Sequence, residues 1–296
     1  MIYTLGESLL DIIIADDGKT SAKPGGAMLN AAVSMARNGM EVSLITETGD
    51  DLTAKYIIDF LKTNGVYTSY ITKYKNIKTP LALAYLDKNK KASYSFYKNY
   101  PENRKLKIPK SFSPNDILLF GSIYATDTAV SKYITEIIDK FTASGGLLIY
   151  DPNIRRSNNL KDKNIKDKID GYLKKAVIVK GSDEDFSNIF GTVNIETQLE
   201  HLHLLNPHAL HIITRGEKGA IGKIEDLRAG QQAYEIIPVS TVGAGDAFSA
   251  GIISYLYKNK TYAKPLKELG KDNLKALLKT GVDFATKVCL TEENYI

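Results

Sequence analysis

The feature that most constrains the fold is an alternation of short apolar runs with longer segments of helical periodicity. The apolar runs have the length and composition of buried strands: EVSLIT (41–46), DILLFG (116–121), GLLIYD (146–151), AVIVKG (176–181) and LHIITRG (210–216). Between them lie segments such as TAVSKYITEIIDKFTASGG (128–146), where apolar residues recur every three or four positions. Strands buried on both faces and separated by helices predict an α/β fold, with a mostly parallel central sheet covered by helices on both faces.

One region departs from this alternation. PLALAYLDKNKKASYSFYKN (80–99) has two alternating runs around a polar turn, which is typical of a hairpin. Together with residues 12–23 it predicts a small sheet that projects from the main body. Such a sheet is either a lid over a site or an edge hairpin without a role there, and the pattern leaves both open. No linker or repeat divides the sequence, so we expect one domain over residues 1–296 with these two segments inserted in it.

Charge and composition exclude several classes of protein. The net charge is only +5, and lysines are interleaved with acids instead of forming a basic stripe, so we expect no nucleic-acid partner. No apolar run approaches the length of a membrane span, and the start MIYTLGESLLDIIIADD lacks the basic segment of a signal peptide. The single cysteine, Cys289, excludes an intrachain disulfide and fits a reducing compartment. We therefore expect a cytoplasmic protein without a membrane partner.

Two glycine-rich segments match nucleotide-binding motifs only in part. GEKGAIGK (216–223) has five residues instead of four between its outer glycines, and no Ser or Thr follows its lysine, so it is not a P-loop. GAGDAF (243–248) has Phe248 where a dinucleotide-binding motif needs its third glycine. All four histidines fall within 201–211, at a spacing that does not favour a metal site.

The segment TVGAGDAFSAG (241–251) predicts a different kind of phosphate site. Gly243, Ala244 and Gly245 directly precede Asp246 where a helix begins, and the unpaired N–H groups and dipole of a helix start attract anions. An acid in that first turn can accept a proton from a hydroxyl that attacks phosphorus, while the N–H groups stabilise the transferred charge. The alternative is a helix-start aspartate after a glycine-rich turn, with no catalytic role.

A second cluster lies in KPGGAMLNAAVSMARNG (23–39). Gly25 and Gly26 let the backbone approach a ligand closely, and Asn30 offers a donor and an acceptor in the first turn of a helix. Upstream, Asp11 follows an apolar strand, where a carboxylate suits bidentate binding of sugar hydroxyls. The alternative is a capped helix and a solvent-facing Asp11.

In this order and separation, the two clusters resemble the signatures of the PfkB (ribokinase-like) family of carbohydrate kinases. GGAMLNAAVSMARNG is similar to its N-terminal glycine-rich signature, and TVGAGDAFSAG to its C-terminal signature, which carries the catalytic aspartate. Four further segments follow the family's order: GDD (49–51), LLIYDPNIRRS (147–157), VIVKGSDEDF (177–186) and IITRGEKGA (212–220). The resemblance covers nearly the whole chain. It implies a ribokinase-like fold with a small β lid, and transfer of the γ-phosphoryl group of ATP to a sugar hydroxyl.

The resemblance also implies residue roles. Asp246 would be the general base, and the anion hole would consist of Gly243, Ala244 and Gly245. Sugar binding would fall to Asp11, Gly25, Gly26, Asn30, Asn153 and Arg155, with the 80–99 hairpin closing over the sugar. Nucleotide binding would fall to Lys180, Asp185, Thr214, Gly216 and Cys289. Mg²⁺ would accompany ATP, with its protein contact near Asp185.

Three departures from the family pattern bear on the cofactors. SDED (182–185) stands where the family commonly has Asn-x-x-Glu, and Asp185 is one methylene shorter than glutamate, so its contact with Mg²⁺ needs a water or a backbone shift. Ser240 stands where members often carry an aspartate, which removes a carboxylate from the region of a K⁺ site. The ending CLTEENYI lacks the family's small residues around the adenine contacts.

The acceptor is the least constrained part of the prediction. GESLLD and DPNIR resemble the fructokinase branch, and the aromatic lid segment YSFYKNY (94–100) suits packing on a sugar face. A sugar-acid or nucleoside kinase of the same family is an alternative, and a catalytically silent sugar- or nucleotide-binding sensor is an alternative of another class. The exposed edges of a lid sheet predict a homodimer formed through the lid.

Overall fold

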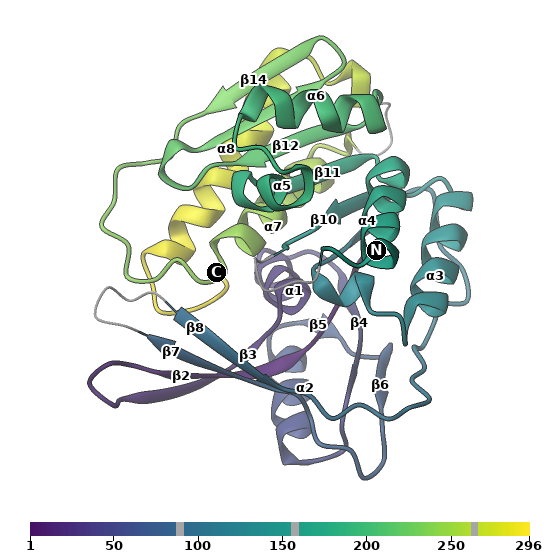
Figure 1. The fold of residues 1–296 in the computed structure, drawn as a ribbon, viewed down its shortest axis with the longest axis vertical. Helices are drawn as coiled ribbons and strands as arrows, with labels where there is room; N and C mark the ends of the chain where they lie inside the picture. The colour runs from purple at the N-terminus through teal and green to yellow at the C-terminus, as the bar shows by residue number, and fades with distance from the viewer. Residues whose placement is uncertain (87–91, 155–159, 262–265) are drawn as a thin grey trace.

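The computed structural model describes residues 1–86, 92–154, 160–261 and 266–296. Over these residues the main body is a ten-stranded sheet with helices on both faces (Figure 1). Its strands are β1 (Ile2–Leu5), β4 (Val42–Thr48), β5 (Val66–Tyr67), β6 (Ile71–Lys73), β9 (Ile117–Gly121), β10 (Leu147–Asp151), β11 (Ile178–Ser182), β12 (Leu210–Thr214), β13 (Ala220–Ile224) and β14 (Leu227–Gln231).

The strands of the main sheet are mostly parallel. They run in the order β14-β13-β12-β11-β10-β9-β1-β4-β5, with β6 paired to β4. Only β13 departs from the parallel direction, since it is antiparallel to both β12 and β14. All of the apolar runs predicted as strands are strands of this sheet, namely β4, β9, β10, β11 and β12. The α/β fold predicted from the alternation is therefore confirmed.

A separate sheet of four strands lies at the lower left in Figure 1, beside the lower part of the main body. Its strands are β2 (Leu9–Ile14), β3 (Thr20–Gly25), β7 (Leu81–Leu86) and β8 (Ala92–Tyr97), in the order β3-β2-β7-β8. β7 and β8 are antiparallel, as the hairpin predicted over 80–99 requires. The polar turn of that hairpin lies at 87–91, outside the described residues. We call these four strands the small sheet.

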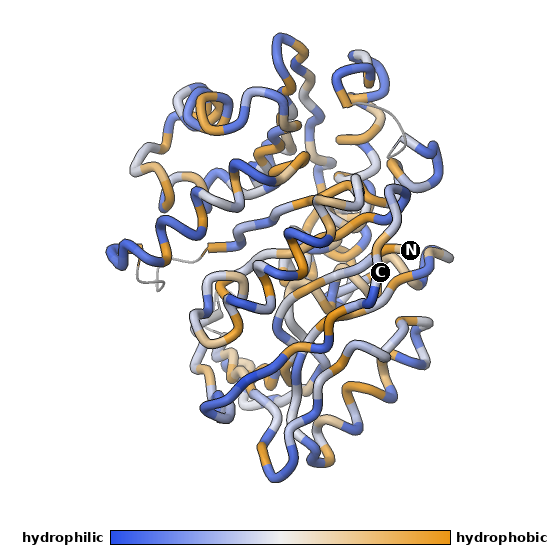
Figure 2. Tube along the Cα trace, turned by 90° about the vertical axis from the view of Figure 1, so that its right-hand side faces the viewer, coloured by the Kyte–Doolittle hydropathy of each residue, from blue (hydrophilic) through white to orange (hydrophobic). Residues whose placement is uncertain are grey.

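The helices that cover the main sheet form two groups. They are α1 (Ala27–Arg37), α2 (Leu52–Thr63), α3 (Ser131–Ala143), α4 (Lys163–Lys175), α5 (Asp183–Phe190), α6 (Ile195–Leu205), α7 (Ala244–Lys258) and α8 (Lys271–Cys289), with short 3₁₀ helices η1 (Ile123–Thr126), η2 (Gly216–Lys218) and η4 (Leu266–Glu268). Figure 2 shows blue and orange residues alternating along the outer helices, as expected where one helix face packs on a core. Among the described residues, no helix combines the length and apolar character needed to cross a bilayer.

Each central strand supplies residues to two hydrophobic cores, because successive side chains point to opposite faces of a sheet. In β9, Ile117 and Leu119 belong to the core shared with α1, α2, α7 and α8. Leu118 and Phe120 belong to the core shared with α3, α4, α5 and α6. The helices therefore hold the sheet from both faces and fix the positions of the loops at its edge.

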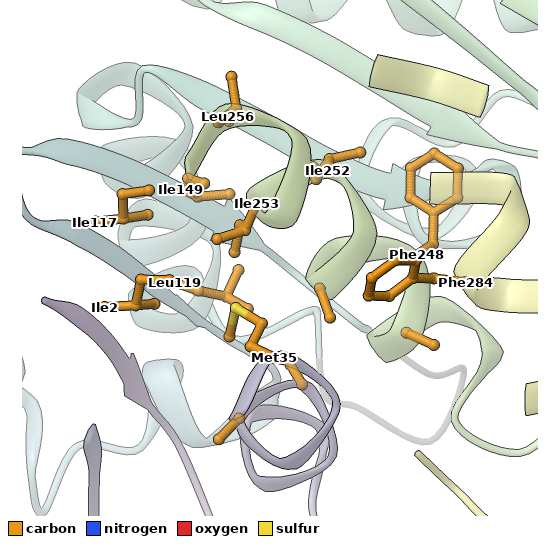
Figure 3. Packing of buried hydrophobic residues seen from close by; sticks show 14 of the residues in the cluster. Ile2, Met35, Ile117, Leu119, Ile149, Phe248, Ile252, Ile253, Leu256 and Phe284 are labelled. Atoms are coloured by element: carbon orange, nitrogen blue, oxygen red, sulfur yellow. The ribbon is translucent and has the colours of Figure 1, made fainter. Parts of the chain in front are cut away.

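Helix α7 is deeply enclosed between the main sheet and α8. Ten of its fifteen residues are buried. Figure 3 shows Phe248 beside Phe284 of α8, and Ile253 toward the strand residues of the same cluster. A Cβ on Gly251 would lie 2.6 Å from the Thr280 carbonyl oxygen, so α7 and α8 approach closely only because this position is glycine. This packing fixes where the first turn of α7 lies.

Candidate active site

The candidate site lies along the carboxyl edge of the parallel strands. β1, β4, β9, β10, β11 and β12 all end at this edge, where open α/β sheets bind their ligands. Lys180 lies in β11, Asp185 in the helix that follows it, and Thr214 ends β12. Asn153 follows β10 with a positive φ of 44°. The topology thus brings these four predicted residues to one edge of the sheet.

The start of α7 carries Asp246 in its first turn, with Gly243 as the N-cap residue. Asn30 of α1 donates a hydrogen bond from Nδ2 to Oδ2 of Asp246, at 2.9 Å. Both side chains are buried, and Oδ1 of Asn30 is enclosed without a hydrogen-bond partner. The two glycine-rich segments, whose residues here are 216 positions apart, therefore meet at one carboxylate.

The turn before α7 is packed against the last residues of the chain. Gly243 has φ of 81°, and a Cβ at this position would lie 2.1 Å from the carbonyl oxygen of Asn294. Glycine is thus needed both for the left-handed backbone and for the close approach. Ile296 is held in turn by Ser34 of α1, whose Oγ accepts its backbone N–H at 3.3 Å. This chain end and α1 together support the turn.

The first-turn N–H groups of α7 form the predicted anion hole. Such groups have no carbonyl partner one turn earlier in their own helix, so they point out of its open end. The N–H of Ala244 donates to the carbonyl of Thr241 at 3.3 Å, which closes the turn. Gly245 is therefore better placed than Ala244 to donate to an anion. The assignment of the anion hole stays a prediction.

A buried ion pair lies directly beneath this turn. Lys180 Nζ is 2.8 Å from Asp151 Oδ2 and donates to the carbonyl of Gly245 at 3.1 Å. Ser249 of α7 donates to the same carboxylate oxygen at 2.9 Å. Burial opposes the charged form of Lys180, but the negative charge of Asp151, followed by Asp185 and Asp246, holds the Lys180 pKa above its ordinary value. Lys180 thus contacts the helix start from below.

Asp185 is occupied by backbone contacts. Its Oδ2 accepts hydrogen bonds from the backbone N–H and the hydroxyl of Ser182, and its Oδ1 accepts the N–H of Ile154, all at 2.7 Å. With Ser182 it forms the capping box that starts α5. Burial, followed by the charge of Asp151, raises the Asp185 pKa. Over the described residues, no three His, Cys, Asp or Glu side chains are grouped to hold a metal ion, and the Mg²⁺ contact of Asp185 stays a prediction.

Asp11 lies in the small sheet, which corrects one expectation from the sequence. It is the third residue of β2 and does not follow the end of a strand, because the chain passes from the main sheet into the small sheet at Gly6–Ser8. The expected proximity to the glycine pair holds. A Cβ on Gly25 would lie 1.9 Å from Asp11 Oδ2, and one on Gly26 would lie 2.2 Å from the Glu7 carbonyl oxygen.

A row of paired residues crosses the small sheet at Asp11. Lys23, Asp11, Ala82 and Phe96 are partners in neighbouring strands, so their side chains lie on one face. Ala82 is fully buried, whereas the Phe96 residue is 51% exposed. Lys23 reaches the backbone carbonyl of Glu292 in the chain end that packs on Gly243. The row therefore faces the main body and the start of α7.

Comparison of the sequence with known proteins shows to which family the chain belongs. Residues 1–288 match the sequence model of the pfkB family carbohydrate kinases. The chain belongs to the pfkB family of carbohydrate kinases. A fructokinase from Rhizobium leguminosarum bv. trifolii is 31% identical over 276 residues, covering 89% of this chain and 82% of that protein. The protein is thus a fructokinase-like carbohydrate kinase, a phosphotransferase with an alcohol as acceptor.

Solved structures show the same fold as this pfkB kinase. The fructokinase from Vibrio cholerae O395, crystallised with fructose, ADP and calcium, superposes with a TM-score of 0.86 at 21% identity, covering 99% of this chain and 94% of that one. Aminoimidazole riboside kinase from Salmonella enterica, crystallised with aminoimidazole riboside and an ATP analogue, gives 0.82 at 20% identity, covering 98% and 94%. These two likenesses establish the ribokinase-like fold with its small sheet.

Two further predicted residues of this pfkB kinase, Gly216 and Cys289, lie around the same edge. Gly216 begins η2, directly after β12, and is exposed with φ of 54°. Cys289 ends α8, and its carbonyl accepts the backbone N–H of Val239 at 2.8 Å in the segment that leads to α7. Burial raises the pKa of its thiol. Arg155 lies outside the described residues. These assignments stay predictions.

A buried charge network at the ends of β1 and β4 was not predicted from the sequence. Glu47 of β4 is fully buried and accepts hydrogen bonds from Arg104, Tyr124 and Tyr74. Glu7, just after β1, accepts hydrogen bonds from Lys98 and Tyr100. These partners come from the segment after β8 and from the loops at the sheet edge, so a local pattern cannot reveal them. An acid within the strand-length segment VSLITET was the one available signal.

Proposed function

We propose that this chain is an ATP-dependent sugar kinase in which Asp246 is the general base. The contact that carries the proposal is the hydrogen bond from Asn30 to Asp246 at the start of α7. It places the carboxylate of Asp246 beside the side-chain amide of Asn30, in the helix that follows Gly25 and Gly26. A structural helix-start aspartate needs no such partner 216 positions away.

The proposed reaction begins with the acceptor hydroxyl hydrogen-bonded to Asp246. Asp246 takes the hydroxyl proton as the sugar oxygen forms its bond to the γ-phosphorus, while the bond from that phosphorus to the bridging oxygen breaks and ADP leaves. The first-turn N–H groups of α7, beginning with Gly245, stabilise charge on the transferred phosphoryl oxygens. Asn30 donates to one carboxylate oxygen of Asp246, which orients the base. Lys180 stabilises the same turn from beneath through the carbonyl of Gly245.

The sugar is proposed to lie between the small sheet and the start of α7. Asp11 offers its carboxylate to sugar hydroxyls, and Gly25 leaves room for it. Phe96 presents a half-exposed ring on the same face of the small sheet, two strands away and thus about 10 Å along the row. Sugars bind aromatic rings through their apolar faces. The small sheet therefore acts as the lid of a single domain, closing over the sugar.

The nucleotide is proposed to lie along the ends of β11 and β12, beside Thr214 and Gly216. ATP would supply the phosphoryl group, and the Mg²⁺ bound to it would neutralise charge on the phosphates. Mg²⁺ in such sites is held largely by phosphates and water. That agrees with the hydrogen bonds that occupy both oxygens of Asp185. Ser240 carries no carboxylate for a monovalent cation, and its hydroxyl accepts the N–H of Val242 at 3.2 Å.

Fructose is the first acceptor to test, because fructokinases recur among the relatives, including a protein from Vibrio alginolyticus at 25% identity. The test is ADP release from Mg-ATP against a panel of hexoses, pentoses, sugar acids and nucleosides. Turnover of fructose above the rest supports the proposal, and turnover of a sugar acid or nucleoside alone would replace its acceptor. Binding of ATP and a sugar without turnover would favour a silent sensor.

A second copy of the chain is the proposed partner, bound through the small sheet. Tyr85 and Tyr97 are half-exposed, at 47% and 58%, on the face opposite to Asp11. Exposed aromatic side chains on a sheet face favour association. Light scattering of the purified protein measures its mass in solution and tests this proposal. A monomeric wild type would reject the dimer, and a dimer that Tyr97→Ser leaves unchanged would reject the small sheet as its interface.

A further inference from the structure

An ion pair lies at the edge of the proposed sugar site. Lys98 Nζ is 2.7 Å from Glu7 Oε2, and the Tyr100 hydroxyl donates to the other carboxylate oxygen of Glu7 at 2.7 Å. The Glu7 side chain is only 9% exposed, whereas that of Lys98 is 33% exposed. Neither residue belongs to the two glycine-rich signatures, and the mechanism above does not use them.

Two contacts place this ion pair beside the sugar-binding candidates. Lys98 Nζ lies 5.2 Å from the centre of the Phe96 ring, at the end of the row that begins with Lys23 and Asp11. On the other side, the carbonyl of Glu7 packs against Gly26, which is why a Cβ there would lie 2.2 Å away. The pair thus bridges the glycine turn of the main body and the aromatic end of the row.

The cations of this region are matched by carboxylates. Lys98 pairs with Glu7, and Arg104 pairs with both Glu47 and Asp127, so two positive charges meet three negative ones. Lys23 stands directly opposite Asp11 in the strand register. Among the described residues of this region, an anionic group on the sugar would therefore meet carboxylates without finding an unmatched cation, which costs free energy in a partly buried site.

We propose that Glu7 is a specificity-determining residue: by pairing with Lys98, it makes the enzyme prefer an uncharged sugar to the corresponding sugar acid. This inference rests on the proposed sugar kinase activity and on the site at Asp11. Removing the charge of Glu7 leaves Lys98 as an unmatched cation that attracts a carboxylate. Removing the charge of Lys98 leaves Glu7 as an unmatched anion that repels one.

The test compares D-fructose with 2-keto-D-gluconate, which differ only in a hydroxymethyl group or a carboxylate at C1. The ratio of kcat/KM for the two sugars is measured for wild type, Glu7→Gln, Lys98→Met and the double variant. Glutamine keeps an acceptor for the Tyr100 hydroxyl. We expect Glu7→Gln to shift the ratio about tenfold toward the acid, the change that 1.4 kcal/mol produces. We expect Lys98→Met to shift it the other way, and the double variant to abolish the gain.

Glu136→Gln is the matched control, because Glu136 pairs with Lys140 on the exposed face of α3, away from the site. We expect it to leave the ratio unchanged. If fructose is phosphorylated but neither Glu7→Gln nor Lys98→Met moves the ratio by more than twofold, this inference is wrong and the kinase assignment stands. If wild type phosphorylates neither of these two sugars nor any other member of the panel, the proposed function fails. The dissociation constants of the two sugars, measured by calorimetry, then test the role of the Glu7–Lys98 ion pair without turnover. The same shifts are expected in the ratio of these constants.

Discussion

Asn30 and Asp246 share a buried hydrogen bond of 2.9 Å between the first turns of two helices from opposite ends of the chain. Gly26 is the N-cap residue of α1 and Gly243 is that of α7, and both helices pack on the same face of the main sheet. Each helix start thus supplies one partner of the bond. The arrangement gives Asp246 a fixed orientation, and several predictions about catalysis and stability depend on it.

Replacing the proposed base should abolish most of the turnover. We expect Asp246→Asn to lower kcat by about 10²–10⁴-fold, the usual contribution of a general base, while ATP binding persists. ADP release from Mg-ATP and fructose measures the loss, and calorimetric titration with ATP shows that the site is still formed. Equal turnover in the variant and wild type would remove Asp246 from the mechanism.

Replacing Asn30 by aspartate should move the pH profile. A second carboxylate within about 3 Å of Asp246 disfavours ionisation of the pair, so the pKa that governs the base rises. We expect Asn30→Asp to lose activity at pH 7 and to regain part of it at higher pH, because the base must be ionised to accept a proton. The measurement is kcat/KM from pH 5 to 9, and Asn30→Ala serves as the control. An acidic limb that stays at the wild-type pH contradicts the prediction.

Gly25 should be intolerant of even one methyl group. Gly25→Ala places a Cβ 1.9 Å from Asp11 Oδ2, so the carboxylate must move. We expect KM for the sugar to rise by about tenfold or more, with a much smaller change in KM for ATP. Gly171→Ala in α4 is the control, since its Cβ would meet nothing within 4 Å and should stabilise the helix by about 0.8–1 kcal/mol. A Gly25→Ala enzyme with unchanged sugar KM would separate Asp11 from sugar binding.

Breaking the ion pair beneath α7 should cost more stability than breaking an exposed one. Lys180→Met leaves Asp151 buried and unpaired, which costs about 3–5 kcal/mol, whereas Lys140→Met on α3 should cost less than about 1 kcal/mol. Because the folded state raises the Lys180 pKa, its stabilisation is fully present at neutral pH and is lost as pH rises through the folded-state value. Urea unfolding of both variants gives the free energies of unfolding, and equal losses would contradict the role of burial.

His211 should make the protein sensitive to mild acid. Burial lowers its pKa from 6.5 to about 4, so between these values the unfolded chain binds a proton that the folded chain does not. The free energy of unfolding should therefore fall by up to about 3 kcal/mol as pH drops from 6.5 to 4. Urea unfolding at pH 7 and pH 5 measures this. His211→Gln should flatten that slope, and an unchanged slope would show that other groups dominate.

The main sheet and the helix starts at the two glycine-rich segments could be predicted from the sequence because both depend on local patterns. Apolar runs of strand length marked β9 and β10. The pair Gly25-Gly26 before an amphipathic pattern marked the start of α1, and Gly243-Ala244-Gly245 before an apolar run marked the start of α7. The position of Asp11 could not be read in this way. Whether residues 9–14 continue the first strand or enter another sheet depends on pairing with β3 and β7, which are distant in sequence.

The charge network around Glu47 and Glu7 shows the same limit for the site. Apart from Tyr74, its cations and hydroxyls come from residues 98–124, where Lys98, Tyr100 and Arg104 lie outside the strands and α-helices and no pattern fixes side-chain direction. Lys180 illustrates the limit in another way: the family resemblance implied a place along the nucleotide, which stays a prediction, but it did not imply the ion pair with Asp151. The ion pair follows only from the burial of Lys180, because a buried charge is unfavourable without a partner of opposite charge, and the sequence does not show that burial.

The 216 positions between Asn30 and Asp246 also set the order in which the molecule can be completed during synthesis. A ribosome that adds about 5–20 residues per second needs roughly 10–40 s to deliver the second partner after the first. For much of that interval the N-terminal strands and the small sheet have been synthesised, but the later strands and helices that cover them have not. Their strand edges and the Glu47 side chain are then exposed to the cell. The nascent chain therefore has to keep a half-built sheet from pairing with neighbouring chains, and the hydrogen bond between Asn30 and Asp246 is among the last contacts to form.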